Sequence, residues 1–132
     1  MAKISRFNIA AVIFDKEGKV LLCKRSMKKK IAPGKWRLPG GRIEIGETPL
    51  EALKRELLEE LSVEAVSISE MKFVYTYRVG EETHQTQYAQ VVIKGDIRLN
   101  YENDDYEYVS KDNMARYVED EHLLIQRKAI GW

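Results

Sequence analysis

Residues 40–61 read GGRIEIGETPLEALKRELLEEL, a segment that ends with the closely spaced glutamates Glu56, Glu59 and Glu60. On a helix, residues three and four apart share a face, so these carboxylates would converge and repel one another. Converging carboxylate oxygens suit a hard divalent cation such as Mg²⁺ or Mn²⁺, which usually keeps coordination positions for water and substrate phosphates. The spacing therefore indicates phosphoryl chemistry, with a solvated helix face as the alternative.

The neighbours of these glutamates favour a ligand site. Gly40 and Gly41 form a pair whose backbone can turn sharply and approach a ligand closely. Arg55 stands next to Glu56 and four residues before Glu59, where its guanidinium can orient acidic side chains.

With this spacing, the segment resembles the Nudix box of Nudix hydrolases. In that box a glycine, five residues, a glutamate and seven residues precede Arg-Glu-apolar-x-Glu-Glu-x-Gly-apolar. The matching residues lie between positions 41 and 63 and are Gly41, Glu47, Arg55, Glu56, Leu57, Glu59, Glu60 and Val63. One position departs from the pattern. Ser62 stands where the family has a glycine that ends the helix in a left-handed conformation, but no metal ligand is lost.

The resemblance implies that an attacking water cleaves a diphosphate joined to another group, with the help of divalent cations. Carried over by position, Glu56, Glu59 and Glu60 would be metal ligands. Glu47 would bind a metal directly, bind it through water, or brace Arg55.

The resemblance also leaves open the last metal ligand and the general base. A backbone carbonyl near Gly40 could add a ligand, and the backbone of Gly41 could approach the substrate. The base would be a glutamate of the box, with Glu59 our choice there, or Glu102 in a later acidic loop. A purely solvated loop is the alternative for that region, and the rival acids in it are Asp104 and Asp105.

Contacts to the substrate are harder to assign from sequence. Arg25 is the best candidate for the substrate phosphates, because it ends a strand that leads toward the box, whereas the lysines at 28–30 read as a solvated loop. Asp120 stands where MutT-like relatives read the base edge, although a helix cap explains it equally well. Several strand aromatics could stack on a base or simply pack in the core: Trp36, Tyr75, Tyr77 and Tyr88.

The short chain and the stretch GKWRLPGGRIEIGETPLEAL look most like the MutT-like branch. That resemblance implies Mg²⁺-dependent hydrolysis of a nucleoside triphosphate, including oxidised purine nucleotides, to monophosphate and pyrophosphate. An ADP-ribose or sugar-nucleotide pyrophosphatase is one alternative, although the proline common in ADP-ribose hydrolases is absent near Arg78-Val79-Gly80. A non-catalytic nucleotide-binding sensor is another, but sensors usually lose the carboxylates that this chain keeps.

The elements that would position these residues can be read from periodicity and turn signals. Residues 7–15 and 19–25 predict a β-hairpin around Gly18, and residues 63–79 and 84–97 predict a second one. Thr48, Pro49 and Glu51 predict a helix start with a capping box. A terminal helix is expected over 119–130. The leucines predicted to form the buried stripe of the first helix are Leu50, Leu53, Leu57 and Leu61.

This order of elements predicts an α+β fold, an α/β/α sandwich with a mixed sheet between helices, in a single domain over residues 1–132. The net charge of +1 gives no bulk attraction to a nucleic acid polymer or an acidic membrane. Cys23 is the only cysteine and is expected in the core. With no signal peptide or membrane-length apolar run in the sequence, a cytoplasmic protein is the default, and a homodimer through a strand edge stays open.

Overall fold

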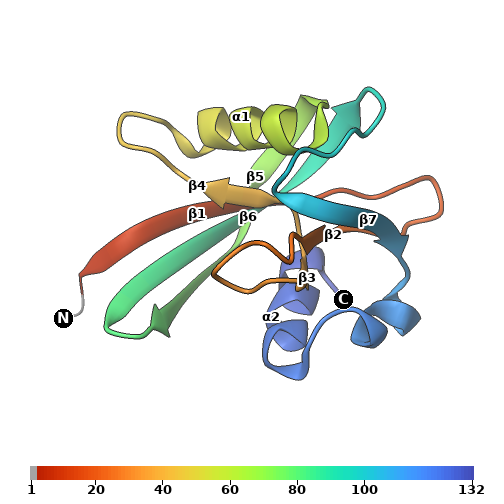
Figure 1. Ribbon diagram of the computed structural model, residues 1–132. Coiled ribbons are helices and arrows are strands. Elements are labelled where there is room, and N and C mark those ends of the chain that lie inside the picture. The colour runs from red at the N-terminus through yellow and green to blue at the C-terminus, as the bar shows by residue number, and fades with distance from the viewer. Residues whose placement is uncertain (1–2) are drawn as a thin grey trace.

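The computed structural model describes residues 3–132, except for the side chains of Lys72 and Asp120. Helix α1 (Pro49–Leu61) lies on one side of the strands and helix α2 (Asp120–Ile130) on the other (Figure 1). The short 3-10 helix η1 (Lys111–Arg116) precedes α2. The predicted sandwich of helices around strands is confirmed.

The strands form two sheets. The larger sheet has the order β4-β1-β6-β5, from Gly40–Arg42, Ile4–Val12, Glu82–Lys94 and Glu64–Val79. The smaller has the order β3-β2-β7, from Trp36–Arg37, Val20–Arg25 and Asn103–Val109. Strands β1 and β6 run parallel, with Ile9 opposite Gln87, and the other pairs are antiparallel. The strand directions are therefore mixed, as predicted, but they are divided between two sheets instead of one.

The first predicted hairpin is wrong in its extent. The tight turn forms, with Gly18 at φ +78°, and the Asp15 amide donates to the Lys19 carbonyl at 2.9 Å. Beyond it, pairing is limited to an isolated bridge between Phe14 and Val20. The two strands then separate because β1 pairs with β4 and β6, whereas β2 pairs with β3 and β7. The second predicted hairpin, β5 with β6, is confirmed.

Helix α1 begins as its sequence predicts. The Glu51 amide donates to Thr48 Oγ1 at 3.1 Å, and the Thr48 amide donates to Glu51 Oε1 at 3.3 Å, which completes the capping box. The helix ends at Ser62, which adopts the left-handed conformation with φ 59° and ψ 30°.

The leucine stripe is confirmed in part. Leu53, Leu57 and Leu61 are fully buried, but Leu50 is 46% exposed. Leu50 lies in the first turn of the helix, and in that turn the fully buried residue is Ala52 instead. The buried face of α1 thus begins two residues later than predicted.

Two groups of buried residues form the core. One packs around α1 and includes Leu53, Leu57, Ile9 and Val91, together with the buried Cys23. The other includes Val12, Tyr88, Val109, Met114 and Ala129, and it joins the strands to η1 and α2. None of the helices among residues 3–132 is long and apolar enough to cross a membrane.

Candidate active site

Helix α1 presents its glutamates in two directions. Glu56 and Glu60, four residues apart, are turned toward the fold and are only 8% and 5% exposed. The Glu59 side chain is 53% exposed. The predicted trio is therefore divided, with two buried carboxylates and one that faces outward.

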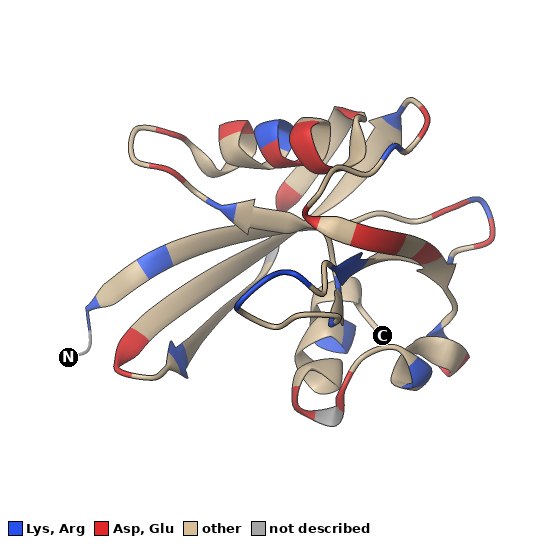
Figure 2. Ribbon diagram, viewed as in Figure 1, with Lys and Arg blue, Asp and Glu red and all other residues tan. Residues whose placement is uncertain are grey.

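The buried pair is joined by Glu102, which directly precedes β7. One carboxylate oxygen from each of Glu56, Glu60 and Glu102 lies within 4.8 Å of the others. Figure 2 shows the acidic positions of α1 above the acidic start of β7. Of the two glutamates proposed as the base, Glu102 is thus in the carboxylate group and Glu59 is outside it.

Hydrogen bonds to the backbone hold Glu102 in place. Its amide donates to Asn100 Oδ1 at 2.9 Å, and its carbonyl accepts from the Ser26 amide at 2.9 Å. The Asn100 amide donates to the Glu60 carbonyl at 3.3 Å, which ties this loop to the end of α1. The two rival acids are exposed, and each accepts a hydrogen bond from a backbone amide: Asp104 from the distant Met27 at 3.1 Å, and Asp105 from its neighbour Tyr106 at 2.8 Å.

The electrostatics of this group favour an added positive charge. Burial raises the pKa of Glu60, and a hydrogen bond with Glu102 and the charge of Glu56 raise it further. Burial also raises the pKa of Glu56, although Arg55 opposes that shift. Buried carboxylates that repel one another in this way are the donor set that a divalent cation would stabilise, so the residues fit Mg²⁺ or Mn²⁺.

Arg55 organises the acidic residues around it. Its guanidinium donates to Glu47 at 2.6 and 2.9 Å, to Glu56 at 2.8 Å, and to Glu59 at 3.4 Å. It also donates to the Arg42 carbonyl at 2.9 Å. The Arg55 hydrogen bond holds the pKa of Glu47 at about 2. Of the roles left open for Glu47, the geometry favours the brace for Arg55.

The paired glycines make room for this arrangement. A Cβ on Gly41 would lie 2.5 Å from the Glu56 carboxyl carbon. A Cβ on Gly40 would lie 2.0 Å from the Ile9 carbonyl oxygen in the neighbouring strand. Gly41 therefore gives space to a carboxylate, and Gly40 allows β4 to approach β1.

Arg25 lies at the end of β2, and its positive charge reaches the carboxylate group, where it opposes the raised pKa of Glu60. Its Nε donates to the Ile31 carbonyl at 2.6 Å. Lys29 sits over the Tyr101 ring at 5.3 Å in the basic loop that follows (Figure 2). The Asp120 side chain lies outside the described residues.

The aromatic residues are divided between core and surface. Tyr88 is buried, as core packing predicts, and burial raises its pKa to about 12. Trp36 packs edge-on against Tyr117 at 5.1 Å between centroids. The Tyr75 and Tyr77 rings are half-buried and stack at 5.6 Å between centroids.

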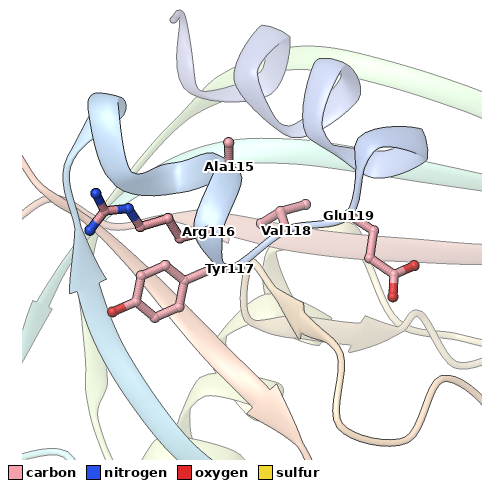
Figure 3. Close-up of a pocket in the computed structure, with 5 residues that line it drawn as sticks. All are labelled: Ala115, Arg116, Tyr117, Val118 and Glu119. Carbon is pink, nitrogen blue, oxygen red and sulfur yellow. The ribbon is translucent and has the colours of Figure 1, made fainter.

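Sequence reasoning missed Arg37 on β3, whose guanidinium lies 3.3 Å from His122 Nε2 on α2. The contact links residues far apart in the chain, and neither residue has a local pattern that would have identified it. A separate shallow hollow of about 350 Å³ lies where η1 meets α2 (Figure 3). It holds none of the clustered carboxylates, and its lining residues are Ala115, Arg116, Tyr117, Val118 and Glu119.

Comparisons with known proteins agree with this geometry. The family model of the NUDIX domain matches residues 5–130. Nucleoside triphosphatase NudI of Klebsiella pneumoniae (strain 342) is 32% identical over 122 residues, covering 83% of this chain and 85% of the relative. NudI of Salmonella newport (strain SL254) is 34% identical over 120 residues, with the same coverage.

Two solved structures share the fold. The MutT protein from Methanosarcina mazei Go1 matches with a TM-score of 0.82 and 22% identity, covering 98% of this chain and 92% of that one. The E. coli ORF135 protein matches with a TM-score of 0.81 and 24% identity, covering 98% of this chain and 91% of that one. At these identities the likeness establishes the shared architecture.

Proposed function

The chain belongs to the NUDIX family of hydrolases, and from that premise we propose that it hydrolyses nucleoside triphosphates to a monophosphate and pyrophosphate with Mg²⁺ or Mn²⁺. The observation that carries the proposal is the approach of three carboxylates, from Glu56, Glu60 and Glu102, within 4.8 Å of one another. The curated relatives named nucleoside triphosphatase support this substrate class.

We assign the cation to the clustered carboxylates, with a carbonyl near Gly40 as a further ligand. When bound, a divalent cation would neutralise phosphate charge and lower the pKa of a coordinated water. Arg55 holds Glu56 in position through its 2.8 Å hydrogen bond, and Glu47 in turn holds Arg55. Arg55 is therefore a positioning residue in this scheme.

The proton of the attacking water would go to Glu59 or Glu102. Glu59 is exposed and makes only a 3.4 Å contact with Arg55, so its carboxylate is available to accept a proton. Glu102 is committed to the buried group. We therefore assign Glu102 to cation binding and Glu59 to the base.

Arg25 would bind a substrate phosphate, because it is the cation whose charge reaches the carboxylate group from β2. The Gly41 backbone borders the same group. Asp120 stays a candidate for the base edge by sequence position alone.

The test is the formation of nucleoside monophosphate, with Mg²⁺, from a panel of nucleoside triphosphates, oxidised purine nucleotides, ADP-ribose and sugar nucleotides, with the second product of each reaction (pyrophosphate or a sugar phosphate) identified by chromatography. The parent is compared with Glu56→Gln and Glu59→Gln, which remove a charge and nearly keep the shape. Glu64→Gln is the matched control, because Glu64 is exposed just beyond the end of α1. We expect both site variants to lose at least about 100-fold in kcat, as is usual when a general base or a metal ligand is removed.

Each outcome has a distinct meaning. Triphosphate turnover that falls in both site variants and persists in Glu64→Gln supports the proposal. Turnover of a sugar nucleotide or ADP-ribose alone would keep the chemistry and replace the substrate. Nucleotide binding without turnover of any substrate would favour a sensor, and full activity of Glu56→Gln would remove the carboxylate group from the mechanism.

A further inference from the structure

One face of helix α2 contacts the segment that leads into the paired glycines. Positions 119, 122 and 126 are three and four residues apart, so their side chains line up along the helix. They contact residues between positions 35 and 38 in the pairs Glu119–Lys35, His122–Arg37 and Gln126–Leu38. The approach to the glycines is therefore attached to α2, on the side of the strands opposite α1 (Figure 1).

The contact made by Gln126 differs from the other two because it is buried and holds backbone. Gln126 Oε1 accepts a hydrogen bond from the Leu38 amide at 3.2 Å, and the two residues are 6% and 7% exposed. The ion pair between Lys35 and Glu119 is exposed, and exposed ion pairs add little stability. A buried amide that loses its acceptor is costly, because water does not replace the lost bond. Gln126 therefore fixes the Leu38 backbone.

Leu38 and Pro39 form the link between the two sheets. Strand β3 ends in the smaller sheet just before this link, and β4 begins in the larger sheet just after it. The Leu38 amide is bound by α2, and the Pro39 carbonyl accepts from the Ala11 amide of β1 at 2.8 Å. The link is thus held by α2 at its first residue and by β1 at its second.

The position of the link determines where the paired glycines lie. A Cβ on Gly40 would lie 2.0 Å from the Ile9 carbonyl oxygen, and one on Gly41 would lie 2.5 Å from the Glu56 carboxyl carbon. Because both glycines are this closely packed, a small shift of the link changes the contact between Gly41 and Glu56. It also moves the carbonyl near Gly40 that we assign to the cation. Residues 38–41 therefore connect Gln126 to the cation site.

We propose that Gln126 is a positioning residue for the cation site, because it fixes the backbone of residues 38–41 against the Glu56 carboxylate. The inference rests on the proposed metal-dependent hydrolysis and adds a residue of α2 that lies outside the box. Gln126 supplies no ligand in this scheme. Its loss should therefore weaken cation binding while all the assigned ligands are kept.

The experiment compares the parent with two substitutions of Gln126. Gln126→Leu removes the acceptor, whereas Gln126→Glu keeps an acceptor oxygen in either protonation state. Two further variants of the same segment are controls. Glu119→Gln breaks the exposed ion pair with Lys35, and Ile130→Val trims a buried side chain of α2 without removing a hydrogen-bonding group.

Three quantities are measured. They are Mn²⁺ affinity by electron paramagnetic resonance, the Mg²⁺ concentration that half-activates hydrolysis, and the NMR shifts of the Gly40 and Gly41 amides in metal-free protein. In Gln126→Leu we expect Mn²⁺ affinity to fall about 10-fold, the lower end of the range for residues that orient metal ligands. Half-activation should need about 10-fold more Mg²⁺, and kcat should recover toward the parent value at saturation. Both glycine amides should shift.

The other variants show whether the lost hydrogen bond is the cause. Gln126→Glu should restore most of the Mn²⁺ affinity, because its carboxyl group can accept from the Leu38 amide. Glu119→Gln and Ile130→Val should keep the parent affinity and the parent glycine shifts. If Gln126→Leu does not fold, Gln126→Asn replaces it under the same expectations, since its amide is one methylene too short to reach Leu38.

Unchanged Mn²⁺ affinity without the Gln126 acceptor would overturn the inference and leave the proposed hydrolysis intact. An equal loss of affinity in Ile130→Val would overturn it too, because general loosening of α2 would then be the cause. Mn²⁺ binding that depends on Gln126, in a protein that cleaves no nucleotide, would support the inference and overturn the proposed hydrolysis. A parent that binds no Mn²⁺ would overturn both.

Discussion

At the scale of single residues, the two glycines at the start of β4 do different work. A side chain on Gly40 would collide with backbone, the Ile9 carbonyl, which cannot move without displacing β1. A side chain on Gly41 would collide with the Glu56 carboxylate, which can turn away. Gly40 is therefore required for the packing of β4 against β1, whereas Gly41 is required for the position of the Glu56 carboxylate.

We predict that Gly41→Ala lowers the affinity for divalent cations by about 10–100-fold, the range seen when the surroundings of a metal ligand are disturbed. The protein should remain folded, because the displaced atom is the end of a side chain. Mn²⁺ binding by electron paramagnetic resonance and thermal unfolding would measure the two effects.

Gly46→Ala is the matched control. Gly46 has φ +86° and open space around its Cα, so alanine should cost about 1 kcal/mol of stability and leave Mn²⁺ affinity unchanged. An unchanged affinity in Gly41→Ala would contradict the role given to this glycine.

At the scale of elements, helix α1 has an optimal start and a costly end. Its first turn has the full capping box, whereas its end requires Ser62 to adopt φ 59°. The left-handed conformation costs a residue with a side chain about 1 kcal/mol of stability relative to glycine. Ser62 Oγ recovers part of the cost by donating to the Arg98 carbonyl at 3.2 Å.

We predict that Ser62→Gly stabilises the protein by about 0.5–1 kcal/mol, because relief of the left-handed conformation outweighs loss of an exposed hydrogen bond. Ser62→Ala keeps the conformational cost and loses the hydrogen bond, so it should be less stable than the parent. Urea unfolding of the three proteins would show both signs. A destabilised glycine variant would mean that the Arg98 contact dominates.

The same helix shows which features can be predicted from sequence. Its cap and the approach of Glu56 and Glu60 follow from local spacing, and both were predicted. Glu102 was named only as one option, because its place depends on Ser26 and Asn100 from other segments. The β1–β2 hairpin was mispredicted for the same reason, since each strand finds its partners far along the chain. Arg37 left no signal because its contact with His122 crosses the whole fold.

At the scale of the whole molecule, the carboxylate group makes global stability depend on pH and on metal. The pKa of Glu60 is raised in the folded state, so above its ordinary value near 4.5 the folded chain holds a proton that the unfolded chain releases. Stability must therefore fall as pH rises from about 5 toward the higher folded pKa. The pKa of Glu56 is also raised in the folded state, so Glu56 likewise makes the protein less stable as pH rises.

We predict that, in buffer with a chelator, Glu60→Gln is more stable than the parent by about 1–3 kcal/mol at pH 8, because it removes the cost of a buried acidic group. The difference should shrink toward pH 5. Adding Mg²⁺ should stabilise the parent and have much less effect on the variant. Urea unfolding across this pH range, with and without Mg²⁺, gives all of these values. A difference that is constant with pH would contradict the raised pKa of Glu60.

The parallel pairing of β1 with β6 also has a consequence for biosynthesis. β1 carries the apolar stretch Ile9–Val12, and its extended partner is β6, with Ile9 opposite Gln87 and Val12 opposite Gln90. Before the ribosome has released β6, β1 has only the three-residue β4 beside it. Strand β1, which is buried in the folded protein, must therefore stay exposed on the nascent chain until most of the protein has been translated. During that time chaperones can bind it.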